Sequence, residues 1–263
     1  MMTDMKRRIR CGGKPMTVIV LAGGRGRRMN ADKARLPVPG GTLLGRVLGQ
    51  VGPLFNEVLV SVSPGQEVDL RKMVGARSQT SDRNEMSRGI PCRILDESDE
   101  PRLKIVRDEA PNLGPLGGIF ACLKVAANDA CAVVACDIPD VDAPLLRKLA
   151  RAAAVAEIAV PVTSKGDFEP LFAVYRKAVI PEIEKLLRAG ERSLIPLFGR
   201  CRTERVPLWK AGLLRNLNTR ADYEEYLKSL RQNGRSSGIH VPTIRGRSGK
   251  SLKSSFSGQK TTI

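Results

Sequence analysis

The chain has 263 residues, of which 42% are apolar and only 4% aromatic, and it carries a formal net charge of +17. This length suits one α/β domain of about 200 residues with additional tails, whose core must be filled mainly by aliphatic side chains. No segment approaches the roughly 18 apolar residues of a membrane-spanning helix, and no hydrophobic signal segment follows the basic residues near the N-terminus. We therefore expect a cytoplasmic protein without a membrane partner.

The excess positive charge is concentrated at the two ends of the chain. Residues 1–15 hold five basic residues and one acidic residue, and residues 231–263 hold seven basic residues and no Asp or Glu. The C-terminal segment is also rich in Gly and Ser, so it cannot bury enough apolar surface to offset its ordering entropy. We interpret 1–15 as a basic N-terminal extension, 16–230 as the folded domain and 231–263 as a disordered basic tail. With the charge distributed in this way, we do not expect nucleic acid as the partner.

Within residues 16–230, short apolar runs alternate with helical patterns. Strands are predicted at 17–22, 57–62, 104–106, 131–136 and 157–162, because runs of this kind are typical of strands buried on both faces. Helices are predicted at 43–48, 117–127, 142–146 and 181–188, and a last helix should follow a capping box at Thr219–Asp222. The alternation favours a single α/β domain with a Rossmann-like, open, mostly parallel sheet and helices on both faces. Residues 75–102 are polar, and we interpret them as a surface insertion.

A glycine-rich, basic loop follows the first predicted strand. Its glycines and cations are Gly23, Gly24, Arg25, Gly26, Arg27, Arg28 and Lys33. Glycines let the backbone approach a ligand closely, and successive N–H groups can form an anion-binding nest that the cations would surround. The loop therefore predicts phosphate binding, with a solvated basic loop as the alternative. Neither the Walker pattern GxxxxGK[ST] nor the dinucleotide pattern GxGxxG is present.

Acidic residues follow two later strands, at the edge where ligands bind in open α/β sheets. Asp137 comes directly after the run 131–136, and a single carboxylate completed by substrate phosphates and water is a common site for Mg²⁺. Asp108 follows the run 104–106 and precedes a second glycine-rich turn, Gly114–Gly118, which could hold a base or ribose. We predict that Asp137 binds Mg²⁺, with a turn or helix cap as its alternative role, and that Asp140 and Asp142 are caps.

The chain has one histidine, His240, and it lies in the predicted tail. This placement excludes a histidine general base in the folded domain, and with it the Ser-His-Asp and Cys-His schemes. The six cysteines form no CxxC pair and are expected to be reduced thiols. The remaining Lys, Arg and carboxylate side chains suit phosphoryl or nucleotidyl transfer, which relies on positioning and charge stabilisation.

Taken in order, these segments resemble the molybdenum cofactor guanylyltransferases, within the larger group of MobA-like nucleotidyltransferases. The opening segment is Leu21-Ala22-Gly23-Gly24 with Arg28-Met29, Asp32-Lys33 and Leu36-Pro37. Later segments are 108–118, 135–139, 169–175, 190–194 and 216–219 followed by Asp222. The resemblance spans about residues 17 to 230, and several motifs in the same order are more specific than any one alone.

The resemblance implies transfer of GMP from GTP to Mo-molybdopterin with release of pyrophosphate and a requirement for Mg²⁺. It implies that GTP is bound by the backbone of Leu21, Ala22, Gly23 and Gly24, by the Lys33 side chain, and by Asp108 and Asp137. Asp137 would also bind Mg²⁺, and Lys33, Arg28 and Asp137 would form the catalytic group. Asn216 and Asn218 would lie on the acceptor side. Molybdoenzymes that receive the product, or their chaperones, would be further partners.

The chain departs from the family pattern at three places. Asn30 stands where the family often has Gly, Ser61 where it has Asn, and Glu169 where it usually has His or Gln.

Gly24 and Gly117 or Gly118 favour the guanylyl over the cytidylyl relatives. Three alternatives stay open: a CTP-dependent molybdopterin cytidylyltransferase, a sugar-phosphate nucleotidyltransferase, and a non-catalytic protein that binds nucleotides or nucleic acid.

Overall fold

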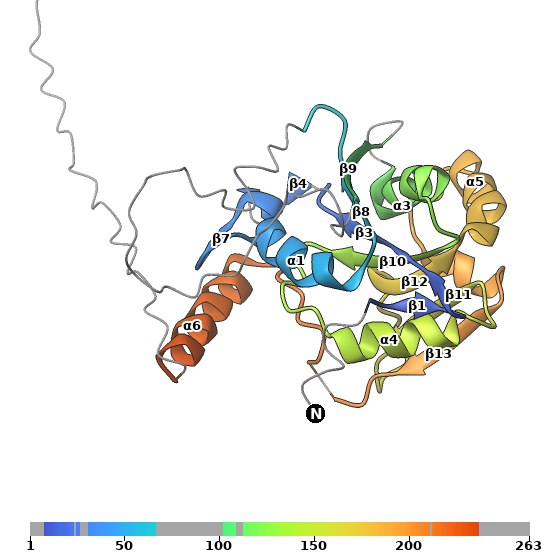
Figure 1. Ribbon diagram of the computed structural model, residues 1–263. Coiled ribbons are helices and arrows are strands. Elements are labelled where there is room, and N and C mark those ends of the chain that lie inside the picture. Colours follow the sequence, from blue (N-terminus) through green and yellow to red (C-terminus); the bar gives the residue numbers. More distant parts are fainter. Residues whose placement is uncertain are drawn as a thin grey trace, which may run out of the picture.

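A seven-stranded sheet forms the centre of the computed structural model, which describes residues 8–23, 25–26, 31–66, 102–108, 113–210 and 212–236. The strands lie in the spatial order β13-β11-β12-β10-β3-β8-β9 (Figure 1). In chain order they are β3 (Thr17–Leu21), β8 (Glu57–Val62), β9 (Arg102–Arg107), β10 (Ala130–Ala135), β11 (Ile158–Val162), β12 (Phe172–Arg176) and β13 (Thr203–Pro207). The five strands predicted from the sequence are confirmed, whereas β12 and β13 were not predicted.

The direction of one strand distinguishes this sheet from a fully parallel one. The pairs β10–β3, β3–β8, β8–β9 and β11–β13 are parallel, while β12 is antiparallel to both β10 and β11. Every residue of β3, β8 and β10 is buried, as expected for strands that are covered on both faces. The open, mostly parallel sheet in a single domain is therefore confirmed.

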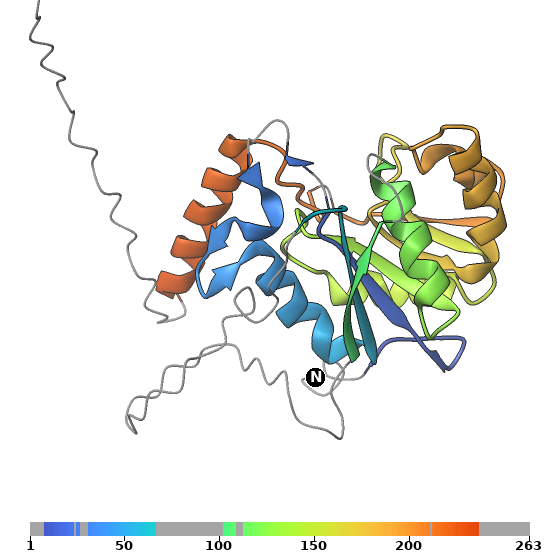
Figure 2. The same ribbon diagram turned by 90° about the horizontal axis from the view of Figure 1, so that it is seen from above.

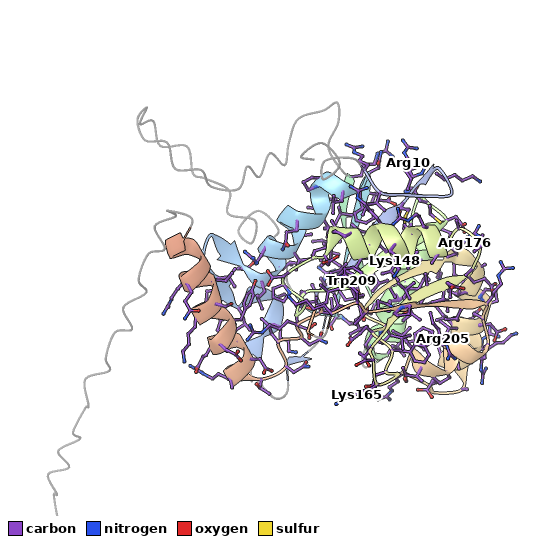
Figure 3. The ribbon with its side chains drawn as sticks, turned by 90° about the horizontal axis from the view of Figure 1, so that it is seen from below. Arg10, Lys148, Lys165, Arg176, Arg205 and Trp209 are labelled. Atoms are coloured by element: carbon purple, nitrogen blue, oxygen red, sulfur yellow. The ribbon has the colours of Figure 1, made fainter. Side chains whose placement is uncertain are left out.

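Helices cover both faces of the sheet. The helices α3 (Gly114–Val125) and α5 (Ile180–Arg188) lie together on one face, and α1 (Leu43–Val51) and α4 (Ala143–Ala152) lie on the other (Figures 1 and 3). The helix starts follow the predicted capping chemistry: the Asp142 carboxylate accepts from the Leu145 N–H at 2.6 Å, at the start of α4. Gly190, just beyond α5, has a φ of 78°, which suits its predicted place at the helix end.

The folded part of the chain begins before the predicted boundary at residue 16. The strands β1 (Arg10–Cys11) and β2 (Lys14–Pro15) form a short hairpin, and Ile9 and Cys11 are buried against the main core. The Ile9 N–H donates to the Leu54 carbonyl at 2.8 Å. Burial of these two side chains explains why the segment is ordered despite its basic residues.

A second, smaller apolar cluster lies at one end of the molecule. It joins Val38, Leu43, Leu217 and Tyr226, and brings α6 (Arg220–Ser236) beside α1 (Figure 2). The capping box at 219–222 is confirmed, since the Thr219 hydroxyl accepts from the Asp222 N–H and the Asp222 carboxylate accepts from the Thr219 N–H. Because α6 reaches Ser236, the first residues of the predicted tail continue the last helix.

The remaining short elements lie around the loop that follows β3 and between the main strands. They are β4 (Arg25–Gly26), β5 (Ala31–Asp32), β6 (Pro37–Val38), β7 (Gly41–Thr42) and the 3-10 turns Lys33–Arg35, Gly52–Leu54, Lys177–Val179 and Ile195–Gly199. The predicted insertion lies outside the described residues except for Arg102, which begins β9, and so does the tail after Ser236. Within the described ranges, no helix is long and apolar enough to cross a membrane.

Candidate active site

The carboxyl ends of β3, β8 and β10 meet at one edge of the sheet. Leu21 is paired with Ala135 of β10 and with Ser61 of β8, and the Cys136 N–H donates to the Leu21 carbonyl at 3.0 Å. Chain segments that leave this edge therefore start side by side. The predicted residues Leu21, Ala22, Gly23 and Asp137 lie at this edge.

The described start of the glycine-rich loop is already hydrogen-bonded within the protein. The N–H groups of Ala22 and Gly23 both donate to the Ser61 carbonyl, at 2.9 and 3.0 Å. These two groups consequently do not form the free anion-binding nest that we expected, because both donors are used to fix the turn. The expected phosphate contacts of Gly24, Arg27 and Arg28 lie outside the described residues, and Arg25 is described only through its backbone in β4.

Gly23 lies where two chain segments approach each other closely. A Cβ atom at this position would lie 3.0 Å from both the backbone nitrogen and the hydroxyl oxygen of Ser63. Gln66 ties the loop from the other side, since its amide nitrogen donates to the Ala22 carbonyl at 3.2 Å and to Asp32 at 3.1 Å. The sequence reasoning missed Gln66, although its place shortly after β8 put it at the ligand edge.

Lys33, Asp137 and Asn218 come together from three distant parts of the chain. The Lys33 ammonium lies 2.9 Å from the Asp137 Oδ2 atom and 3.2 Å from the Asn218 Oδ1 atom. Asp32 begins the 3-10 turn that carries Lys33, because its carboxylate accepts from the Ala34 N–H at 3.1 Å. The side chains of Lys33 and Asp137 are each 18% exposed, so the pair is largely shielded yet open to a ligand.

The second oxygen of Asp137 has no protein partner among the described residues. Its Oδ1 atom is buried and makes no hydrogen bond, although buried carboxylate oxygens are normally satisfied. The Leu217 N–H donates to the Asp137 carbonyl at 2.9 Å and so holds the backbone of this residue. A Mg²⁺ ion commonly takes one or two protein carboxylates together with substrate phosphates and water. The free oxygen of Asp137 fits such an ion.

A second polar group lies at the ends of β8 and β9. The Ser61 hydroxyl donates to the Asp108 Oδ1 atom at 3.2 Å, so the residue that replaces the family's Asn is bonded to the predicted nucleotide contact. Burial raises the pKa of the Asp108 carboxyl, and the hydrogen bond from Ser61 opposes this shift. A Cβ atom on Gly118 would lie 2.5 Å from the Ser61 hydroxyl oxygen and 3.2 Å from the Asp108 Oδ1 atom. Glycine at position 118 therefore leaves room for the hydrogen bond between Ser61 and Asp108.

The two polar groups are separated by a distance that suits an extended nucleotide. The strands β10 and β9 are three strand positions apart, which corresponds to about 14 Å at the usual strand spacing. Asp137 therefore lies near the middle of the edge, after the fourth of the seven strands, and Asp108 lies at one end of it, after the outermost strand β9. A ligand with phosphates near Lys33 and a base near Ser61 would span this distance.

The other half of the edge carries the residues predicted on the acceptor side. Asn216 hydrogen-bonds to the Glu169 carboxyl. Burial raises the pKa of this carboxyl, and the hydrogen bond to Asn216 opposes the shift without cancelling it. Asn218, two residues later, instead contacts Lys33. Beyond them, Trp209 follows β13 and is 54% exposed, with the Lys148 ammonium 5.8 Å from its ring centroid (Figure 3).

The structure corrects the role expected for Asp140. Asp142 is a cap, but the Asp140 Oδ1 atom accepts from the Arg46 guanidinium at 2.7 Å and from the Tyr226 hydroxyl at 2.9 Å. These contacts join α1 and α6, which sequence patterns along either helix could not reveal.

Comparisons with known proteins agree with this geometry. Residues 18–204 match the family of the MobA-like NTP transferase domain. The chain is 30% identical over 220 residues to a probable molybdenum cofactor guanylyltransferase of Carboxydothermus hydrogenoformans, a match that covers 81% of this chain and 95% of that protein. It is also 30% identical over 237 residues to the molybdenum cofactor guanylyltransferase of Syntrophotalea carbinolica, with 86% and 96% covered.

A solved structure shows the same fold. The crystal structure of molybdopterin-guanine dinucleotide biosynthesis protein A from Archaeoglobus fulgidus superposes with a TM-score of 0.60 at 21% identity. The superposition covers 82% of this chain and 100% of that chain. The match to the domain family covers most of the chain, and the relatives are matched over nearly their whole length. The chain therefore belongs to the MobA-like NTP transferase family.

Proposed function

We propose that this protein is a molybdenum cofactor guanylyltransferase, which transfers GMP from GTP to Mo-molybdopterin and releases pyrophosphate. The observation that carries the proposal is the meeting of Lys33, Asp137 and Asn218 at the carboxyl edge of the sheet. The similarity to proteins named molybdenum cofactor guanylyltransferases supports the choice of nucleotide and acceptor.

The reaction is an in-line displacement at phosphorus. An oxygen of the terminal phosphate of molybdopterin attacks the α-phosphorus of GTP, a new P–O bond forms, and the bond to the β-phosphate oxygen breaks. Pyrophosphate takes the electron pair of the broken bond. Such a step requires alignment of the two phosphates and neutralisation of their charge more than it requires a protein base.

Lys33 supplies one fixed positive charge for these phosphates. Its ammonium is already held at 2.9 Å from Asp137 and 3.2 Å from Asn218, so little reorganisation is needed when the substrate binds. Arg25 and Arg28 belong to the same loop and would add charge around the departing pyrophosphate.

We include Mg²⁺ in the proposal, held by the Asp137 carboxylate. Its Oδ1 atom is free to bind an ion while the Oδ2 atom keeps its contact with Lys33. When bound, the ion offsets negative charge that develops on the α-phosphate. Lys33 and Asp137 would then orient the nucleotide together, with its base near Asp108, Ser61 and Gly118.

We propose the cytoplasm as the place of this reaction. Molybdoenzymes or their chaperones would accept the guanylylated product.

Pyrophosphate release with each of GTP, CTP, ATP and UTP, with and without molybdopterin, tests the proposal. We expect release only with GTP and molybdopterin together, and its loss when Mg²⁺ is chelated. Preference for CTP would identify a cytidylyltransferase instead, and release with a sugar phosphate as acceptor would identify a sugar-phosphate nucleotidyltransferase. Nucleotide binding without turnover on any of these acceptors would contradict the enzymatic assignment.

A further inference from the structure

Gln50, near the end of α1, binds the chain segment that follows Asp137. Its amide nitrogen donates to the Pro139 carbonyl at 2.7 Å, and its amide oxygen accepts from the Val141 N–H at 3.0 Å. The same nitrogen donates to the Arg46 carbonyl at 3.1 Å, one turn earlier in α1, which fixes the orientation of the amide. One side chain therefore satisfies a donor and an acceptor of a segment that has left the sheet.

The segment is also held by its other neighbours. Arg46 and Tyr226 both bind the Asp140 carboxylate, at 2.7 and 2.9 Å, and the Leu217 N–H binds the Asp137 carbonyl at 2.9 Å. In addition to these contacts, the two hydrogen bonds from Gln50 to Pro139 and Val141 fix backbone atoms on both sides of Asp140. Val47 and Val51, on either side of Gln50 in α1, face the core and are fully buried.

The direction of the Asp137 side chain depends on this backbone. Asp137 has one oxygen on Lys33 and one oxygen without a protein partner, so its carboxylate is aimed by the Cys136–Val141 turn rather than by a second hydrogen bond. Some groups do not bind the metal but hold a metal-binding side chain in place. Their removal typically lowers the metal affinity by about 10- to 100-fold. Tolerances at such sites are on the order of 0.5 Å.

We propose that Gln50 is a positioning residue for the metal-binding carboxylate of Asp137, acting through the backbone of the turn between β10 and α4. This inference rests on the proposed metal site at Asp137. Gln50 itself does not touch the substrate. Its role is to hold the turn so that the Oδ2 atom keeps its contact with Lys33 while the Oδ1 atom stays without a protein partner.

The test uses the variant Gln50→Met in the full-length chain. Methionine has similar length and helix propensity, so α1 should form, but all three hydrogen bonds of the amide are lost. We expect the affinity for Mg²⁺, measured by calorimetry in the presence of GTP and without acceptor, to fall by about 10-fold or more. Amide hydrogen exchange should accelerate at Val141, whose N–H loses its acceptor. At saturating Mg²⁺, kcat should fall less than the metal affinity.

A matched control removes a side-chain amide from the opposite edge of the sheet. The Asn128 amide donates to the Thr17 hydroxyl at 3.0 Å, next to the buried Glu57. Asn128→Ala should lower the urea concentration at the midpoint of unfolding, because one hydrogen bond is lost, without changing the Mg²⁺ affinity. If Gln50→Met does not fold, Gln50→Glu keeps the acceptor for Val141 and loses the donation to Pro139. Its metal affinity should lie clearly below that of the wild type.

The possible failures are distinguishable because Asp137→Asn is measured in parallel. If Gln50→Met, or Gln50→Glu in its place, binds Mg²⁺ as tightly as the wild type while Asp137→Asn binds it weakly, the positioning role is wrong and the metal site stands. If Asp137→Asn binds Mg²⁺ as tightly as the wild type, the proposed metal site is wrong and the role of Gln50 falls with it. An equal loss of affinity in Asn128→Ala would attribute the effect to general destabilisation and overturn the inference.

Discussion

Replacement of Asp137 by Asn should remove turnover while leaving the protein folded and able to bind GTP. The substitution keeps the size of the side chain and deletes the charge that would hold Mg²⁺. The benefit of that charge is greatest when the new bond forms at the α-phosphorus, so its loss affects the transition state more than the ground state. We expect kcat to fall by roughly 10²-fold or more, which corresponds to about 2.7 kcal/mol.

The structural cost of the same substitution is smaller. Opposite charges at the 2.9 Å separation of Lys33 and Asp137 attract by about 6 kcal/mol at an effective dielectric constant of about 20, before desolvation is considered. The net contribution of the pair is far lower, because the cost of removing both charged groups from water offsets most of this attraction. Asparagine also keeps an oxygen that can accept from Lys33. The loss of activity should therefore exceed the loss of stability.

Three measurements separate these effects: pyrophosphate release kinetics, calorimetric GTP affinity and urea unfolding. Asp142→Asn is the matched control, because it makes the same change in the same turn and Asn caps a helix as well as Asp does. Asp140 is not a suitable control, since it binds both Arg46 and Tyr226. Small and equal effects on kcat at positions 137 and 142 would refute the assignment and make Asp108 the next candidate for the metal.

Four further predictions concern the loop, the polar group at Asp108 and the tail. Lys33→Ala should weaken GTP binding strongly with the fold intact, and an unchanged affinity in a calorimetric titration would contradict its role. Burial raises the pKa of Asp108, so the folded protein binds this proton more tightly than the unfolded chain and loses stability as the pH rises above 3.8. Asp108→Asn should therefore be more stable than the wild type at pH 7 in urea unfolding, and this gain in stability should shrink toward pH 4. The variant should also bind GTP less well. A gain in stability that does not depend on pH would show that it has another cause. Gly118→Ala should cost about 1 to 3 kcal/mol of stability and weaken GTP binding, because its Cβ would lie 2.5 Å from the Ser61 hydroxyl oxygen; wild-type values for both would show that the turn can shift. Truncation after Ser236 should preserve kcat, since residues 237–263 contain no Asp or Glu, and a large loss in the folded truncated protein would show that the tail reaches the site.

The buried strands could be predicted because their residues carry the signal themselves. β3, β8 and β10 are continuous apolar runs, and every residue in them is buried. β12 has a similar apolar run. Hydrophobicity does not show the direction of a strand, nor that β12 inserts antiparallel between β10 and β11. β13 is an edge strand in which only Val206 is buried, so its pattern is too weak to detect.

At the site, the charged residues could be predicted but their partners could not. Lys33 and Asp137 were marked by residue type and by position after a strand, and the structure places them in contact. Gln50 and Gln66 make their contacts between a helix or turn and a distant loop, which depend on how the elements pack. The hydrogen bonds from Ala22 and Gly23 to the Ser61 carbonyl likewise arise from the pairing of β3 with β8, which the loop sequence does not contain.

The sequence separation of the residues around Lys33 has a consequence for biosynthesis. Its two partners follow it by 104 and 185 residues, so the ribosome makes Lys33 early, Asp137 midway and Asn218 near the end of the folded part. Every strand of the central sheet is synthesised before Asn218, and the chain can begin to pair them while the last contact is still missing. A translation product that stops after β13 would keep the whole sheet but lack Leu217, Asn218 and α6. Such incomplete copies are expected to be inactive, because the centre that would transfer the nucleotide is assembled last.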